Sequence, residues 1–74
     1  MLPIEALNAL MEGKTVQLTN DAFKGLLDEF ATYHEKPDNS FLINSIEQSC
    51  ISLFNFNTQE VYYDIGFEFI TLSF

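Results

Sequence analysis

Apolar and polar positions divide the chain into a helical first part and a strand-rich second part. Behind Pro3, which suits the first turn of a helix, apolar residues recur at the spacing of three and four that one helix face requires: Ile4, Leu7, Leu10 and Met11. Gly13 supplies the left-handed residue that commonly ends a helix. The pattern predicts a helix over about residues 3–12.

A short strand and a second helix follow. Residues 14–18 alternate between polar and apolar and predict a strand with Val16 and Leu18 turned inward. Residues 19–21 offer an N-cap with an acid in the first turn. The second helix is predicted to run to about Glu35, where turn-forming residues 37–40 end it. Its apolar stripe consists of Phe23, Leu26, Leu27, Phe30 and His34.

The rest of the chain is rich in β-branched and aromatic residues and predicts strands at about 41–46, 50–56, 60–65 and 67–74. The apolar positions change phase near Gly66, which indicates either a hairpin or a bulge in one long strand. The order α-β-α-β-β-β predicts an α+β fold in which two helices pack on one face of a three- to four-stranded antiparallel sheet. Residues 1–74 are predicted to form a single domain.

Charge narrows the classes of partner. Eleven carboxylates face three lysines and no arginine, and the formal net charge is −8. Direct nucleic-acid binding requires cations at the phosphates, so nucleic acid is excluded as a direct ligand. A basic protein surface is the partner that this charge attracts, although acidity also serves solubility alone. Eight phenylalanines and three tyrosines give the chain the bulk for a folded core.

The localisation expected from the sequence is cytoplasmic. Cys50 is the single cysteine, so no intramolecular disulfide can form, and its apolar neighbours suggest a buried small side chain. The first residues lack the basic and apolar regions of a signal peptide. No apolar run reaches the roughly 18 residues of a membrane span, so we expect no membrane partner.

Catalytic and metal-binding patterns are absent from the sequence. One histidine and one cysteine cannot form a closed zinc site, and the three glycines are too scattered for a phosphate-binding loop. No serine lies in a nucleophile motif. We therefore expect no enzymatic activity, no metal and no cofactor.

Two acidic groups are candidate partner-binding residues. Asp21, Asp28 and Glu35 are seven residues apart and share one face of the second helix, with Glu29 beside them and Asp38 just beyond. They form either an acidic ridge that docks on a basic groove or simply the solvated face of an amphipathic helix. Their spacing of roughly 10 Å along the helix is too sparse for close DNA mimicry without the other acids.

The second group is on a predicted strand, where Glu60, Tyr62 and Asp64 would point to the open face of the sheet and Val61, Tyr63 and Ile65 to the other. A tyrosine between carboxylates is typical of an interface anchor. The alternative is an ordinary surface tyrosine with cross-strand neighbours.

Residues 5–16, which read EALNALMEGKTV, resemble the opening of many small phage and prophage proteins. In size and acidity the whole chain is similar to phage-encoded inhibitors, including anti-CRISPR and DNA-mimic anti-restriction proteins. This resemblance implies stoichiometric inhibition of a host defence protein, such as a CRISPR effector or another nuclease, in the host cytoplasm. The alternatives are a homo-oligomeric structural or assembly protein, with a homodimer as its simplest form, and the immunity partner of a basic toxin.

The charge predicts that the purified protein does not retain duplex or single-stranded DNA at physiological salt, because too few cations are present to displace the counterions of DNA. A gel-shift titration to micromolar protein measures this. A retained DNA band would contradict the interpretation of the charge.

Overall fold

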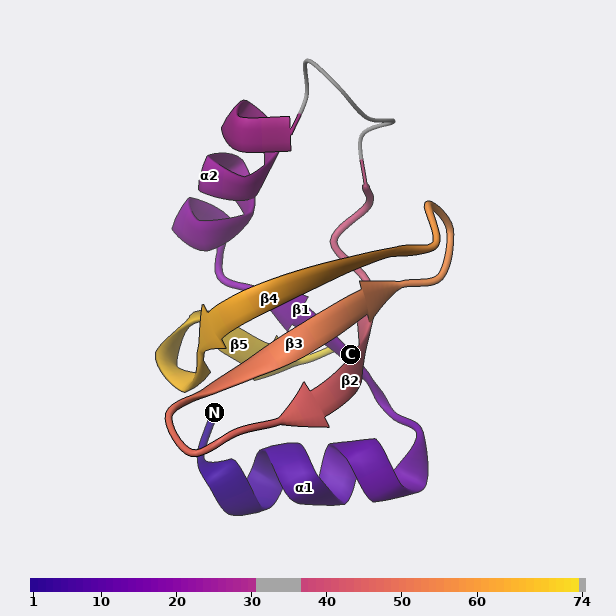
Figure 1. The fold of residues 1–74 in the computed structure, drawn as a ribbon, viewed down its shortest axis with the longest axis vertical. Helices are drawn as coiled ribbons and strands as arrows, with labels where there is room; N and C mark the ends of the chain where they lie inside the picture. Colours follow the sequence, from indigo (N-terminus) through magenta and orange to yellow (C-terminus); the bar gives the residue numbers. More distant parts are fainter. Residues whose placement is uncertain (31–36, 74) are drawn as a thin grey trace.

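The computed structural model describes residues 1–30 and 37–73 of the chain (Figure 1). Within these residues the protein is α+β, with more strands than the three or four expected. None of the described helices is long and apolar enough to cross a membrane. The elements, in chain order, are α1 (Pro3–Glu12), β1 (Thr15–Leu18), α2 (Asn20–Phe30), β2 (Phe41–Ile46), β3 (Cys50–Asn55), β4 (Glu60–Gly66), the 3-10 turn η1 (Phe67–Phe69) and β5 (Ile70–Leu72).

Helix α1 has the bounds that its end signals predict. The Leu2 backbone N–H donates to the Glu5 carboxylate at 2.7 Å, and Gly13 adopts the left-handed conformation with φ of 67°. The helix face that enters the core is formed by Ala6 and Ala9, which are 0% and 2% exposed. Small side chains therefore mediate the packing of α1 on the sheet.

The described strands form one antiparallel sheet in the order β4-β3-β2-β1-β5. β4 and β5 are consecutive in the chain, yet they are the two edges. In a flat sheet four strand spacings would separate them by about 19 Å, whereas the step from Gly66 to Ile70 reaches at most about 14 Å. The sheet must therefore curl, and in Figure 1 β3 and β4 pass in front of β1 and β5.

Two register shifts beside Ser52 strengthen the curl. Asn44 is the extra residue in β2, and in β4 Tyr63 and Asp64 together lie opposite Ser52. A bulge bends its strand and increases the local twist. The buried Ser52 hydroxyl is satisfied on the β2 side, where the Ser45 hydroxyl lies 2.6 Å away and the Asn44 amide donates at 3.2 Å.

The two helices were expected together on one face of the sheet. α1 packs against β2 and α2 against β1, and both contribute to the one hydrophobic core, through Ala6 and Ala9 of α1 and Leu26 of α2. In Figure 1 the two helices lie at opposite ends of the curled sheet. The predicted end of the second helix near Glu35, including His34, lies outside the described residues.

The last predicted strand, residues 67–74, is also corrected. Residues 67–69 form η1, and only Ile70–Leu72 continue as a strand. β5 forms neither a hairpin with β4 nor a bulged continuation of it, because it pairs with β1, where Val16 lies opposite Leu72. Ile70 is fully buried there, so the phase change near Gly66 reflects a crossing from one edge of the sheet to the other.

The interior of the curled sheet holds the core. Phe41 is fully buried at the start of β2 and meets the Tyr62 ring edge to face, with the centroids 5.9 Å apart. Val16 and Leu18 point inward as predicted, at 0% and 2% exposure. The buried apolar residues are Ala6, Ala9, Val16, Leu18, Leu26, Phe41, Ile43, Ile51, Leu53, Tyr62 and Ile70.

Asparagine side chains fix the segment that enters β2. The Asn39 amide donates to the Leu18 carbonyl at 3.0 Å, and its oxygen accepts from the Leu18 N–H at 2.8 Å, which imitates a strand bridge. Asn55, fully buried, donates to the Asp38 carbonyl and carboxylate at 3.0 and 2.9 Å. The Asn55 side-chain oxygen accepts two backbone N–H groups of the β3–β4 turn at 3.0 Å each. Asn55 thus ties this turn to the segment before β2.

We expect Asn55→Ala to lower the free energy of unfolding by about 2–4 kcal/mol, because it leaves several buried polar groups without partners. Urea denaturation measures this. The matched control is Asn57→Ala, which removes one exposed hydrogen bond to Asp38 and should cost less than about 1 kcal/mol. Equal losses in the two variants would show that burial of Asn55 is not what stabilises the turn.

Candidate functional site

The acids predicted on the second helix are only partly placed together. Asp21, Asp28 and Glu29 are exposed on α2, and Glu35 lies outside the described residues. Asp38 is on the separate segment before β2, where hydrogen bonds from Asn57 and Asn55 hold the pKa of its carboxyl below the usual 3.8. The Asp38 carboxyl is therefore charged at neutral pH, and its two oxygens accept hydrogen bonds from Asn55 and Asn57.

The prediction that Tyr62 faces solvent is wrong. Tyr62 is 5% exposed and Tyr63 is 68% exposed, so these two residues exchange their predicted faces, whereas Asp64 is exposed and Ile65 packs on the core as predicted. The cause is the bulge, in which Asp64 adopts a φ of 61° and the extra residue allows both Tyr62 and Ile65 to face the core. Burial raises the pKa of the Tyr62 phenol above 10.0, and the charge of Glu60 adds to this, although the Thr58 side chain lowers it.

A groove lies between α2 and β4. It consists of two adjoining hollows of about 330 and 360 Å³ that share Leu26, Glu29 and Ile65 as lining. The first hollow extends towards β1 and η1, and its further lining is Leu18, Ala22, Gly25, Asp64, Gly66 and Phe69. The second follows β4 and is further lined by Val61, Tyr62 and Tyr63. We call the two hollows together the α2–β4 groove.

The groove has an apolar floor and an acidic rim. Glu29 lines both hollows and Asp64 lines the first, so the fold brings together one acid from each predicted group. The Glu68 carboxylate lies close to Gly66, and Gly66 is one of the residues that line the first hollow. Among the described residues that line the groove, none is basic. An apolar segment that carries lysine or arginine is the ligand that such a surface complements.

Gly25 is the groove residue that could have been found from the sequence. Glycine in a helix interior costs about 1 kcal/mol relative to alanine, and nothing lies within 4 Å of a Cβ placed at Gly25. A side chain there would protrude into the first hollow instead of clashing with the core. Gly25 therefore weakens α2, and its lack of a side chain leaves the wall of the first hollow open.

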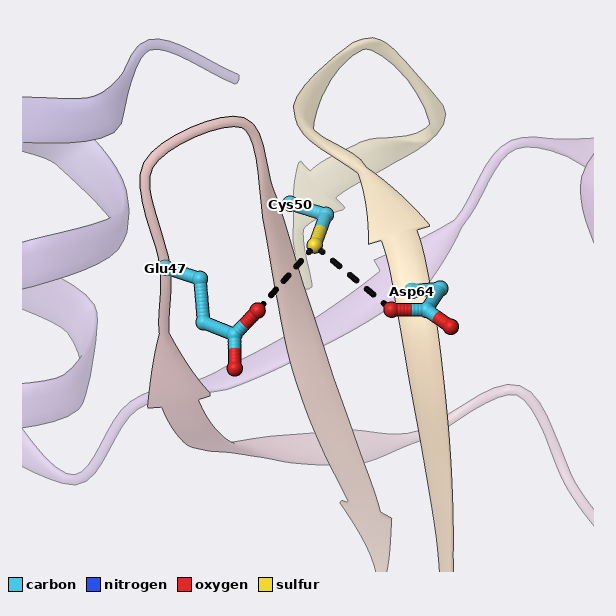
Figure 2. A group of neighbouring side chains, drawn as sticks. All are labelled: Glu47, Cys50 and Asp64. Carbon is cyan, nitrogen blue, oxygen red and sulfur yellow. Dashed lines mark hydrogen bonds between the residues drawn. The ribbon is translucent and has the colours of Figure 1, made fainter.

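A second cluster was not foreseen and is drawn in Figure 2. The Cys50 thiol, at the start of β3, points between the carboxylates of Glu47 and Asp64, with Sγ 3.7 Å from Glu47 Oε2 and 3.9 Å from Asp64 Oδ1. The Glu47 backbone N–H closes the β2–β3 turn on the Cys50 carbonyl at 2.8 Å. The turn and the β4 bulge thus hold the three side chains side by side.

The charges around Cys50 determine its chemistry. Desolvation raises the pKa of the thiol above 9.0, and the negative charges of Glu47 and Asp64 raise it further. The thiol is therefore protonated at neutral pH and is a poor nucleophile. Cys50 is partly exposed, which corrects the expectation of a buried side chain.

The same three residues are the only group of candidate metal ligands within the described part of the chain, with ligand atoms within 4.8 Å of one another. A closed zinc site requires four ligands, and a metal would have to displace the thiol proton. The cluster thus offers an incomplete donor set, and Asp64 links it to the rim of the α2–β4 groove.

Comparisons of this chain with protein-family models, with curated proteins and with solved structures found no match.

We expect the alkylation rate of Cys50 by iodoacetamide to rise with pH along a curve whose midpoint lies above 9.0, because the thiolate is the reactive form. Glu47→Gln should shift this midpoint to lower pH, since it removes one of the two neighbouring charges. Mass spectrometry of timed samples gives the rates. A midpoint at or below 9.0 in the unaltered protein would contradict the charge argument.

Proposed function

We propose that this protein is a non-enzymatic inhibitor that binds, one to one, a basic nucleic-acid-handling protein through the α2–β4 groove. The instance that we favour is a phage-encoded, anti-CRISPR-like inhibitor of a host defence nuclease. The observation that carries the proposal is the groove itself, with its apolar floor and a rim that includes Glu29 and Asp64. The net charge of −8 attracts a basic partner over a longer range.

The apolar part of the groove gives this attraction a specific anchor. Tyr63 and Phe69 are 68% and 45% exposed at the two hollows. Aromatic side chains beside a pocket are the residues that most often dominate a binding energy. The charged rim would then set the association rate, and the aromatic contacts would set the lifetime of the complex.

The lack of catalytic activity is also a proposal. Its support is that the protein's single cysteine carries a raised pKa, which disfavours nucleophilic catalysis at neutral pH. Inhibition would then require a molar equivalent of this protein for each target. Titration against a fixed amount of target nuclease would show a linear loss of cleavage that ends at equimolar protein.

Capture experiments test the partner class. We expect the immobilised protein to retain basic nucleic-acid-binding proteins from a nuclease-treated bacterial lysate, and to release them as salt is raised, because exposed charge pairs are screened. Mass spectrometry identifies the retained proteins. Retention of acidic proteins alone, or retention that salt does not weaken, would contradict the proposal, and a basic toxin among the captured proteins would favour the immunity alternative.

Paired variants locate the binding surface. Glu29→Gln with Asp64→Asn removes two charges from the groove rim, and Asn tolerates the left-handed conformation of Asp64. We expect target affinity, measured by surface plasmon resonance, to fall about tenfold, mainly through the association rate. The matched control, Asp21→Asn with Asp28→Asn, also removes two charges, and it affects only the exposed acids of the α2 ridge.

A third variant separates shape from charge. Gly25→Leu leaves every charge in place but adds a side chain to the first hollow, so it should also reduce affinity about tenfold or more if the partner enters the groove. Loss of affinity in the Asp21 and Asp28 variant alone would instead assign binding to the acidic ridge of α2 and would end the groove assignment.

A further inference from the structure

The large apolar side chains of α1 face away from the core. Residues three or four apart share a helix face, so Ile4, Leu7 and Met11 lie on one side. Ala6 and Ala9 lie on the opposite side and contact the sheet. Ile4 is 60% exposed, Leu7 is 43% exposed and Met11 is 76% exposed. The stripe that the sequence offers as a core face is therefore directed outward.

The exposed stripe forms part of a wider apolar face. Leu2 and Leu10 flank it, at 64% and 38% exposure. A contiguous apolar patch beyond a few hundred Å² commonly marks an interaction surface. The buried face of α1 consists of Ala6 and Ala9, so most of the surface of Leu2, Ile4 and Met11 stays exposed. Their exposure to water is unfavourable in an isolated chain, and a covering surface would remove it.

Charge distinguishes this face from the groove. Residues 1–14 contain Glu5, Glu12 and Lys14, a net charge of −1, so seven of the eight net negative charges lie in residues 15–74. Lys14 is paired with Glu12 at 2.9 Å. This face has little negative charge to attract a basic partner. For the same reason, two copies of the face would repel each other only weakly.

The acids of α2 do not oppose self-association through α1. α2 lies at the other end of the molecule from α1 (Figure 1), and the longest dimension is 34 Å. Charges separated by more than the Debye length, about 8 Å at physiological ionic strength, are largely screened. Two copies joined at α1 would hold the acids of their α2 helices apart.

We propose that the outward face of α1 is a self-association surface, on which a second copy of this chain packs its own α1 around a two-fold axis. Ile4, Leu7 and Met11 follow the alternating spacing of three and four that forms the seam of paired helices. One patch on both subunits is what a two-fold contact requires. This inference does not depend on the proposed inhibitory function.

The length of α1 sets the strength of the contact. Ten residues make a helix about 15 Å long, which offers less than the roughly 800 Å² per partner of a stable interface. The dimer should therefore be weak, with a dissociation constant in the range of about 10–500 µM.

Sedimentation equilibrium of the purified chain, with a reductant to exclude Cys50 disulfides, tests this from about 10 µM to 1 mM protein. We expect a monomer–dimer equilibrium that high salt preserves or strengthens, since the contact is apolar. Ile4→Gln with Met11→Gln should weaken it at least about tenfold. Both residues are more than half exposed and glutamine is a good helix former, so circular dichroism should show an intact fold.

The matched control is Phe56→Gln, which removes an exposed aromatic side chain, 42% exposed, from the turn between β3 and β4. It should leave the equilibrium unchanged. A monomer over the whole concentration range would overturn the proposal. So would a dimer that survives the α1 variant, or one that the Phe56 variant weakens equally. None of these outcomes depends on whether a basic partner exists.

Discussion

The short connection from β4 to β5 is the constraint on which the rest of the structure depends. Three residues separate the two strands in the chain, yet these strands are the opposite edges of the described sheet. The sheet can satisfy both conditions only by curling. Curling brings α2, which packs on β1, close to β4 and so creates the groove. It also places α1 at the opposite end of the sheet from α2, with one helix face packed on the sheet and the other exposed.

The curl also explains which parts of the fold follow from the sequence. The bounds of α1 and β2 follow from local signals, namely Pro3 and Gly13 for the helix and the turn residues before Phe41 for the strand. These signals act within a few residues and do not depend on contacts with distant parts of the chain. The number of strands, the position of β5 and the separation of the helices depend on the closure of the sheet, which no local pattern encodes.

The candidate site divides in the same way. Glu29 and Asp64 could be chosen as exposed acids from the sequence, but their meeting at one groove results from the curl. The inversion of Tyr62 and Tyr63 arises from an extra residue in β4, and an alternating pattern gives no means to place a bulge. The bulge lets both the Tyr62 ring and Ile65 pack in the core, which a regularly alternating strand would not allow. Cys50 reaches Glu47 and Asp64 through a turn and this same bulge.

The pairing of β5 with β1 has a consequence for how the chain folds. Val16 lies opposite Leu72, so the two strands that complete the sheet are separated by most of the sequence. Contacts between such distant residues slow folding, because a long loop must close before they contribute any stability. Until then β1 retains one unpaired edge, and Ile70 has no place in the core. Folding should thus be limited by this last strand, and a nascent chain would keep an open β1 edge throughout the synthesis of the residues between.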